Sequence, residues 1–360
     1  MAEPLKNIYD HEFVERLAAV LDQHAPNGIN QASFIASVFA DGWEDLELKA
    51  RMRRISESMR ASLPDDYLKA LPIVRDAASA FAGYMSMFFP DFVEQYGMDH
   101  WQPSVDALHW MTRFGSSEFA VRPFLIADPK RMVAEMFTWT NDENEHVRRL
   151  ASEGCRPLLP WGMNLPVFQN DPLPLMPILE ALRDDESEYV RRSVANNLND
   201  IAKDHPKLVL KTAKAWLGES PAVDKLVKHA CRTLLKNGDA KAMRLFGFRD
   251  PGAVKLEVFE LTNESVPLGG DLEFTFQLCS DSPLGKLRLE YRLDFARPHG
   301  RGATKVFKIS ESESKLLERS VQRRHSFIDR STRKHYVGEH KLTLIVNGVA
   351  KESLRFDVVN

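Results

Sequence analysis

One segment of this chain occurs twice. Residues 144–151 read NEHVRRLA, and residues 187–194, which lie 43 positions later, read SEYVRRSV. A weaker third copy, DKLVKHAC, occupies residues 224–231. A repeat of roughly 40–47 residues that is built from helical pairs is typical of HEAT-like solenoids. Because each repeat in such a stack contacts its neighbours, equivalent side chains of successive repeats line a shared face.

Length and composition indicate a globular protein with more than one domain. Of the 360 residues, 28% are charged and 44% are hydrophobic, which allows a large core. The opening residues, MAEPLKNIYD, lack the basic and apolar regions of a signal peptide, and no 18-residue apolar run follows. Cys155, Cys231 and Cys279 lack the spacing of zinc ligands or of a disulfide framework. We therefore expect a cytoplasmic protein with no membrane span and no metal.

Two kinds of periodicity divide the chain near residue 250. Apolar residues at helical spacing fill residues 10–60, and residues 63–97 predict one helical pair with its turn at 88–92. Further helices are predicted at 103–114, 117–126, 129–140, 144–159, 173–184, 187–204, 206–217 and 222–236. After Gly247 short β-rich segments follow, at 254–258, 272–276, 287–291 and 342–346 among others. About seven strands in the last ~110 residues favour an immunoglobulin-like sandwich. We expect an all-α HEAT-like solenoid over 1–249 and an all-β sandwich over 250–360.

The aligned helices predict rows of polar side chains. Residues four apart share a helix face, so helix 187–204 presents Arg192, Asn196 and Asp200 together. Helix 144–159 presents Arg149 and Glu153 in the same way. The alignment adds Glu118 and Arg122 from the earlier segment and Lys228 and Arg232 from the later helix. Apolar residues occupy the opposite face, so these polar rows should line an exposed concave surface.

Simpler interpretations of the same residues stay open. Arg149 and Glu153 are four residues apart and would form a surface ion pair worth a few tenths of a kcal/mol. A tryptophan such as Trp161 is more often part of a core than a binding platform. Two adjacent asparagines, Asn196 and Asn197, are poor helix formers, and ligand contact is one reason for them. In combination, cations that flank carboxylates favour a groove that acts on an anionic ligand.

The C-terminal part carries a local basic block. Residues 251–360 hold 18 Lys and Arg against 15 Asp and Glu, although the net charge of the chain is −3. Between Arg297 and Lys341 there are 12 basic and 5 acidic residues. Such a block favours contact with nucleic acid, and a solvated face of a β-domain is the alternative. Its candidate DNA-binding residues are Arg323, Arg324, Arg330, Arg333 and Lys334.

Four segments of the chain resemble the AlkC branch of the DNA alkylation repair proteins, which are relatives of the AlkD glycosylases. They are FFPDFVE (88–94), SSEFAVRPF (116–124), NEHVRRLASEGCRPLLPW (144–161) and EYVRRSVANNLNDI (188–201). The resemblance covers residues 5–248, and its two long motifs show no departure from the family pattern. The β-rich tail resembles the immunoglobulin-like domain that some AlkC proteins carry.

The resemblance implies a DNA glycosylase for bases alkylated on ring nitrogens, such as 3-methylcytosine, 1-methyladenine and 3-methyladenine, that does not enclose the lesion in a tight pocket. The positions that match the family's carboxylates are Glu118, Glu153 and Asp200, and Trp161 matches its aromatic partner. We expect Glu153 and Asp200 to lie nearest the reacting sugar. Double-stranded DNA with alkylated bases is the implied partner of a monomer that needs no cofactor. DNA contacts in the solenoid are predicted for Arg122, Arg149, Arg192, Asn196, Lys228 and Arg232.

Two other functions compete with this interpretation. Relatives of the fold can hold branched or bent DNA without cleaving it, but the presence of all three acids and Trp161 argues against a non-catalytic binder. A HEAT scaffold for other proteins would present an apolar or acidic face. The predicted rows instead carry Arg149 and Arg192.

Overall fold

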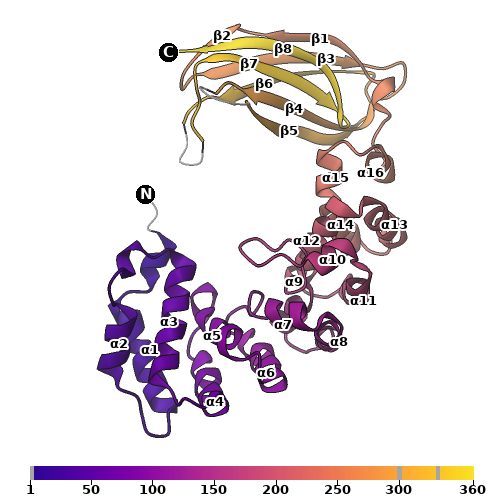
Figure 1. Ribbon diagram of the computed structural model, residues 1–360. Coiled ribbons are helices and arrows are strands. Elements are labelled where there is room, and N and C mark those ends of the chain that lie inside the picture. Colours follow the sequence, from indigo (N-terminus) through magenta and orange to yellow (C-terminus); the bar gives the residue numbers. More distant parts are fainter. Residues whose placement is uncertain (1–3, 298–301, 330–332) are drawn as a thin grey trace. The chain divides into compact units, whose positions relative to one another are not determined.

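The protein is helical first and β-stranded afterwards, as the periodicities predict (Figure 1). The computed structural model describes residues 4–297, 302–329 and 333–360. Its α-helices are α1 (His11–His24), α2 (Gln31–Val38), α3 (Leu48–Ser62), α4 (Tyr67–Ala78), α5 (Phe88–Tyr96), α6 (Trp101–Met111), α7 (Arg122–Ala127), α8 (Pro129–Trp139), α9 (Glu145–Glu153), α10 (Pro166–Asn170), α11 (Met176–Ala181), α12 (Glu188–Asp204), α13 (Pro206–Trp216), α14 (Pro221–Ala230), α15 (Arg232–Lys236) and α16 (Ala240–Leu245). In the part that the structure describes, no helix is both long and apolar enough to cross a membrane.

Several predicted helix boundaries are wrong. The segment 88–92 begins α5 and does not form a turn. The predicted helix 144–159 ends at Glu153, with Gly154 as its C-cap. Gly154 is closely packed, since a Cβ there would lie 2.7 Å from Met136 and Val121. The helix predicted at 222–236 is interrupted between α14 and α15, and residues 117–121 precede α7 in a turn. Neither α10 nor α16 was predicted, since both are too short for a periodic pattern.

The repeated motif performs the same structural task in both copies. Arg148 Nη1 donates to the carbonyls of Asp142 and Glu143, each at 3.0 Å. Arg191, its equivalent, donates to the carbonyls of Asp185 and Glu186. The first arginine of each copy therefore ties its helix to the preceding loop, and the second is left for other contacts. In three dimensions α12 packs against both α9 and α14, as stacked repeats should.

Packing divides the chain into two compact units. The first unit comprises residues 1–205 and 216–230, and the second comprises residues 206–215 and 231–360. The second unit thus contains α15 and α16 together with the strands. The division into domains at residue 250 stays a prediction.

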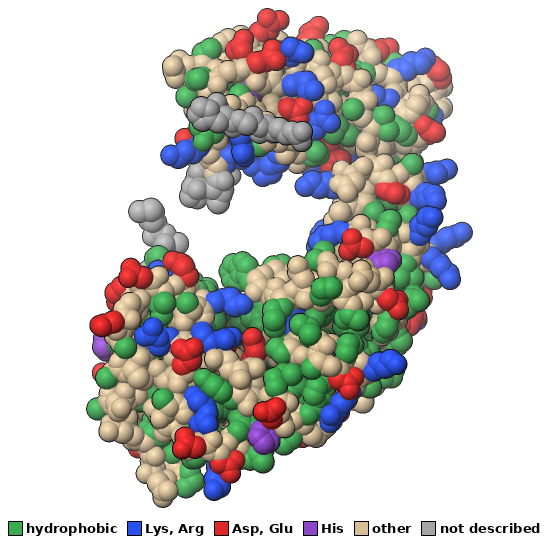
Figure 2. Space-filling model, in the orientation of Figure 1, with side chains coloured by type: hydrophobic (Ala, Val, Ile, Leu, Met, Phe, Trp, Pro, Cys, Tyr) green, Lys and Arg blue, Asp and Glu red, His purple; other side chains and the backbone are tan. Residues whose placement is uncertain are grey.

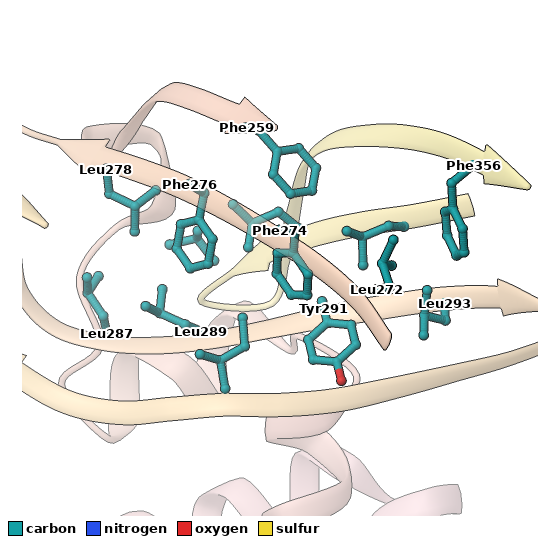
Figure 3. Packing of buried hydrophobic residues seen from close by; sticks show 14 of the residues in the cluster. Phe259, Leu272, Phe274, Phe276, Leu278, Leu287, Leu289, Tyr291, Leu293 and Phe356 are labelled. Carbon is teal, nitrogen blue, oxygen red and sulfur yellow. The ribbon is translucent and has the colours of Figure 1, made fainter. Parts of the chain in front are cut away.

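The strands of the second unit form two sheets. They are β1 (Lys255–Leu261), β2 (Ser265–Pro267), β3 (Asp271–Cys279), β4 (Gly285–Phe295), β5 (Ala303–Ser314), β6 (Glu318–Ser326), β7 (Gly338–Val346) and β8 (Val349–Val359). One sheet has the order β1-β3-β6 and the other has the order β2-β8-β7-β4-β5. Alternate residues such as Phe274, Phe276, Leu289 and Tyr291 point into a shared core (Figure 3). Of the four segments that alternation predicted, three lie within strands of this sandwich, and the fourth, 254–258, begins one residue before β1.

Candidate active site on the helical unit

The three predicted acids meet in the first unit, although each comes from a different element. Glu118 lies in the turn before α7, Glu153 is the last residue of α9, and Asp200 lies in α12. Because α9 packs on α12, the end of one helix faces the middle of the other. The fold thus brings together residues that are up to 82 positions apart.

Cations lie between these acids and join them into one series. Glu118 Oε2 lies 2.6 Å from Arg149 Nη1, and Arg149 Nη2 lies 3.5 Å from Glu153 Oε1. Arg156 then bridges the two helices, with Nη1 2.6 Å from Glu153 Oε1 and Nε 2.9 Å from Asp200 Oδ2. Lys203 ends the series, 3.1 Å from Asp200 Oδ1. We call Glu118, Arg149, Glu153, Arg156, Asp200 and Lys203 the ion chain.

The inner acids of the ion chain are buried, which corrects the expectation of an exposed polar row. The side chains of Glu153 and Asp200 are only 6% and 3% exposed, against 14% for Glu118. The reason is local: where α9 packs on α12, Arg156 and Ser193 contact Glu153, and Arg156 and Lys203 contact Asp200. Arg192, in the same row of α12, stays exposed. Buried carboxylates require partners, and Ser193 donates to Glu153 Oε2 at 2.6 Å. Of the three acids, Glu118 is therefore the most accessible to a ligand.

The arginines stay charged in this setting. Burial alone would lower the pKa of the Arg156 guanidinium, but the charges of Glu153 and Asp200 outweigh it and raise that pKa above its ordinary value. The same balance, with Glu118 and Glu153 as the main partners, raises the pKa of Arg149. Arg149 and Arg156 therefore place positive charge between the acids of the ion chain.

Arg149 does more than form the surface pair that its spacing allows. Its contact with Glu153, four residues away, is the longer one, and its contact with Glu118 is the shorter. It also donates to Ser116 Oγ at 3.1 Å and stacks over the Tyr189 ring, 5.0 Å from the centroid. Arg149 thus orients the accessible acid, and its predicted contact with DNA stays a prediction.

Trp161 stands beside this site as an exposed platform and is not part of a core. It is 69% exposed, and its φ of 64° places a non-glycine residue in the left-handed region. The Tyr84 ring meets the indole edge-on at 6.3 Å between centroids. The carbonyl of Trp161 accepts a hydrogen bond of 2.8 Å from Lys49 Nζ of α3.

Arg122 has a different role from the predicted one. It is fully buried, and its guanidinium donates to the carbonyls of Gly154, Arg156 and Met163. Burial lowers the pKa of Arg122 to about 10. A side chain with no exposed surface cannot contact a phosphate, so the prediction that Arg122 binds DNA is wrong. It instead fixes the loop that carries Arg156 and Trp161.

The remaining predicted groove residues lie outside the ion chain. Arg192 is exposed and lies 3.6 Å from Glu188, and Asn196 Oδ1 lies 3.0 Å from His229 Nε2. Lys228 is half-buried in α14, and Arg232 is exposed at the start of α15 in the second unit. The adjacent Asn197 has a packing role, since its Nδ2 donates to the Ser152 carbonyl at 2.8 Å. DNA contacts by Arg192, Asn196, Lys228 and Arg232 stay predictions.

Comparison with known proteins identifies the family. A model described as DNA alkylation repair enzyme matches residues 89–238, and one for the C-terminal Ig-like domain of YhaZ matches residues 255–360. Uncharacterized protein YhaZ of Bacillus subtilis (strain 168) is 46% identical over 355 residues, covering 98% of this chain and 99% of YhaZ. The alkylpurine DNA glycosylase AlkC of Pseudomonas fluorescens, solved bound to DNA containing an abasic site analog, is 38% identical with a TM-score of 0.92. That match covers 99% of this chain and 100% of AlkC.

The chain belongs to the DNA alkylation repair family, in its AlkC branch. This confirms the resemblance found in the sequence motifs. It also confirms the fold class, a HEAT-like helical region followed by an immunoglobulin-like sandwich.

The basic block of this AlkC-branch protein is a mixed surface in the structure. Arg323, Arg324 and Lys334 are exposed, but Arg324 lies 3.3 Å from Asp271 and Arg323 donates to the Ile309 carbonyl at 2.7 Å. Arg333 lies over the Phe295 and Phe307 rings, and Arg330 is outside the described residues. On the sandwich in Figure 2, basic and acidic side chains are interspersed. DNA binding by this block stays a prediction.

Sequence reasoning missed the residues that hold the acids in place. Arg156 is three positions after Glu153, and this i,i+3 spacing was the available clue. Rows of residues four apart do not contain this spacing, so they do not predict Arg156. Two of the missed residues, Ser193 and Lys203, lie on α12 but belong to no repeated pattern. Two others, Lys49 and Tyr84, come from parts of the chain far from the repeats.

Proposed function

We propose that this protein is a DNA glycosylase that releases cationic N-alkylated bases, such as 3-methylcytosine, 1-methyladenine and 3-methyladenine, from double-stranded DNA. The observation that carries the proposal is the ion chain, with an accessible Glu118 at one end and the exposed Trp161 beside it. It is supported by similarity, over the whole length, to an alkylpurine DNA glycosylase that was solved with DNA.

The chemistry suits such a site. A base alkylated on a ring nitrogen is positively charged and leaves as a neutral molecule, so it needs little help from a general acid. The sugar that remains resembles an oxocarbenium ion, as in glycoside hydrolysis. Fixed carboxylates stabilise that cation, and they do so best when they are already oriented before the reaction. Glu118 is the acid that we assign nearest the sugar. From their buried positions, Glu153 and Asp200 would add negative electrostatic potential and hold the neighbouring arginines in place.

Trp161 and the cations complete the proposed site. A tryptophan face attracts a cationic sugar or base. Exposed Arg192 and half-buried Lys228 would hold flanking phosphates without reading sequence. We expect base release to leave an abasic site with the strand intact, because the amine of Lys203, the lysine of the ion chain, is held by Asp200 at 3.1 Å.

The test is base release from a duplex oligonucleotide that contains one 3-methylcytosine. We expect release that survives chelator, strand cleavage only after added alkali, and no adduct trapped by borohydride. Uracil and O6-methylguanine should be poor substrates because they do not carry a positive charge. Equal release of uracil and 3-methylcytosine would contradict the proposal. Tight DNA binding without any release would instead favour a non-catalytic DNA-structure binder.

A further inference from the structure

The backbone of Trp161 contacts a lysine of α3 that lies 112 positions away in the sequence. We propose that Lys49 is a positioning residue that holds Trp161 over the candidate site. The inference rests on the proposed function for its catalytic consequence, but its structural part can be tested separately.

Besides an electrostatic interaction with Glu94, Lys49 makes a hydrogen bond and a ring contact that lead to the site. Its Nζ donates to the Trp161 carbonyl at 2.8 Å, across 112 positions of sequence. The same Nζ lies 4.4 Å from the centroid of the Phe119 ring, and Phe119 directly follows Glu118. Lys49 therefore links the backbone of the exposed tryptophan to the segment that carries the accessible acid.

The backbone of Trp161 needs such support. A bulky residue in the left-handed region costs of order 1–3 kcal/mol and persists only where surrounding contacts hold it. Trp161 has a φ of 64°, and its indole is largely exposed, so side-chain packing contributes little. The lysine contact is on the carbonyl of the strained residue itself, where it opposes a flip of the following peptide.

The next residues have anchors that do not involve Lys49. A Cβ on Gly162 would lie 3.1 Å from Leu159 and 3.3 Å from Arg122, and Arg122 donates to the Met163 carbonyl. Removing the Lys49 ammonium should therefore release Trp161 without unfolding the loop. This makes the effect local and measurable.

Lys49 is also exposed, so direct binding to a DNA phosphate is the competing role. The two roles differ in their coupling to Trp161. A positioning residue acts through the tryptophan, so its removal has no further effect once the indole is gone. A phosphate ligand acts independently of the tryptophan, so the losses caused by the two substitutions multiply. DNA binding then also weakens, and the DNA-binding constant depends less steeply on salt concentration.

The first experiment is a double-mutant cycle on single-turnover release from the 3-methylcytosine duplex at saturating enzyme. Lys49→Met keeps the apolar stem over Phe119 and removes the donor. We expect a loss of about tenfold, the effect of one charge-assisted hydrogen bond, and no added loss in Lys49→Met/Trp161→Ala relative to Trp161→Ala. Lys69→Met, an exposed lysine of α4, is the matched control and should release base like the wild type. Multiplicative losses in the double variant would overturn the proposal.

The second experiment does not depend on activity. In protein labelled with 5-fluorotryptophan, the ¹⁹F resonance that disappears in Trp161→Phe belongs to Trp161. We expect this resonance to shift or broaden in Lys49→Met, with the other five tryptophan resonances unchanged, and to stay fixed in Lys69→Met. An unmoved Trp161 resonance in Lys49→Met would overturn the positioning role. If the wild type releases no base, the proposed function fails, and the spectra still decide whether Lys49 holds Trp161.

Discussion

At the scale of single residues, identical carboxylates differ in what surrounds them. Both oxygens of Glu153 are bonded, one by Arg156 and one by Ser193. Glu118 is bonded at Oε2 and is more exposed. A charge-removing substitution should therefore separate the chemical contribution of an acid from its structural one.

We expect Glu118→Gln to lower the single-turnover rate of base release by about 10²–10³, since it removes one preorganised charge, while the thermal midpoint stays near that of the wild type. Glu153→Gln should lower the rate and also the midpoint, because it leaves the buried Arg156 with one carboxylate fewer; breaking a buried pair costs about 3–5 kcal/mol. DNA affinity should hold or rise in both. Exposed Glu143→Gln is the control. Full activity in both acid variants would show that these carboxylates do not take part in catalysis.

These residues also show how far the sequence alone can lead. Glu118, Glu153 and Asp200 were predicted from rows of residues four apart, and the family motifs implied their roles and that of Trp161. The burial of Glu153 and Asp200 was not predicted, because periodicity places a polar residue in solvent and cannot show how closely α9 packs on α12. For the same reason the predicted role of Arg122 as a DNA ligand is wrong, since its guanidinium donates to three backbone carbonyls.

At the scale of elements, the two copies of the repeat are not equally dependent on their first arginine. Arg148 adds a paired contact with Asp185, at 2.7 and 3.0 Å, to its bonds with the loop carbonyls. For Arg191 the carbonyls of its own preceding loop are the partners. Arg148 and Asp185 are both almost buried, with side chains 9% and 6% exposed.

Arg148→Ala should accordingly destabilise its helix pair by about 3–5 kcal/mol, because it leaves Asp185 buried without its partner. Arg191→Ala should cost about 1 kcal/mol. Hydrogen exchange of the amides in α9 and α12 measures both. Equal loss of protection in the two variants would show that the motif stabilises each repeat in the same way.

The histidines of the sandwich make its stability depend on pH. Burial lowers the pKa of His340, and burial together with Arg333 lowers that of His335. In the folded state His340 Nε2 lies 3.0 Å from the Tyr336 carbonyl and Nδ1 accepts from the Ala296 amide, which fits a neutral ring. The unfolded chain takes up protons near pH 6.5. Stability is therefore complete above about pH 6.5 and is lost as the pH falls below it.

We expect the thermal midpoint of the second unit to fall between about pH 7.5 and about pH 5.5. In His340→Gln that fall should be smaller, since one of the groups that take up a proton on unfolding is gone. His11→Gln, which changes an exposed ring on α1, should leave the fall of the midpoint with pH unchanged. A midpoint that does not change over this interval in the wild type would contradict the role of the buried rings.

At the scale of the whole molecule, deleting the tail is a poor test of what the tail binds. The second unit includes helices before residue 250, and Gly238 and Gly348 touch so closely that a Cβ on Gly348 would lie 2.2 Å from Gly238 Cα. Removing residues 251–360 would take away the strands that form one compact unit with α15 and α16. Charge substitutions on the sandwich surface avoid that damage.

We therefore predict that Arg324→Gln with Lys334→Gln weakens DNA binding and lowers the salt slope by about one for each phosphate that the protein no longer neutralises. The measurement is the dissociation constant over a range of salt concentrations. Lys255→Gln with Arg355→Gln, at exposed positions outside the basic block, is the control. An unchanged slope in the first pair would mean that the basic block is only a solvated face.

The ion chain has an evolutionary consequence. A descendant of this protein that lost Glu153 or Asp200 would retain a buried guanidinium at Arg156 with half of its counter-charge. Selection for stability would then favour replacement of Arg156 as well, so the acids and their arginine should be inherited or discarded as a block. Relatives that have abandoned catalysis should be recognisable by coordinated replacement at these three positions, and single replacements should be rare among stable proteins.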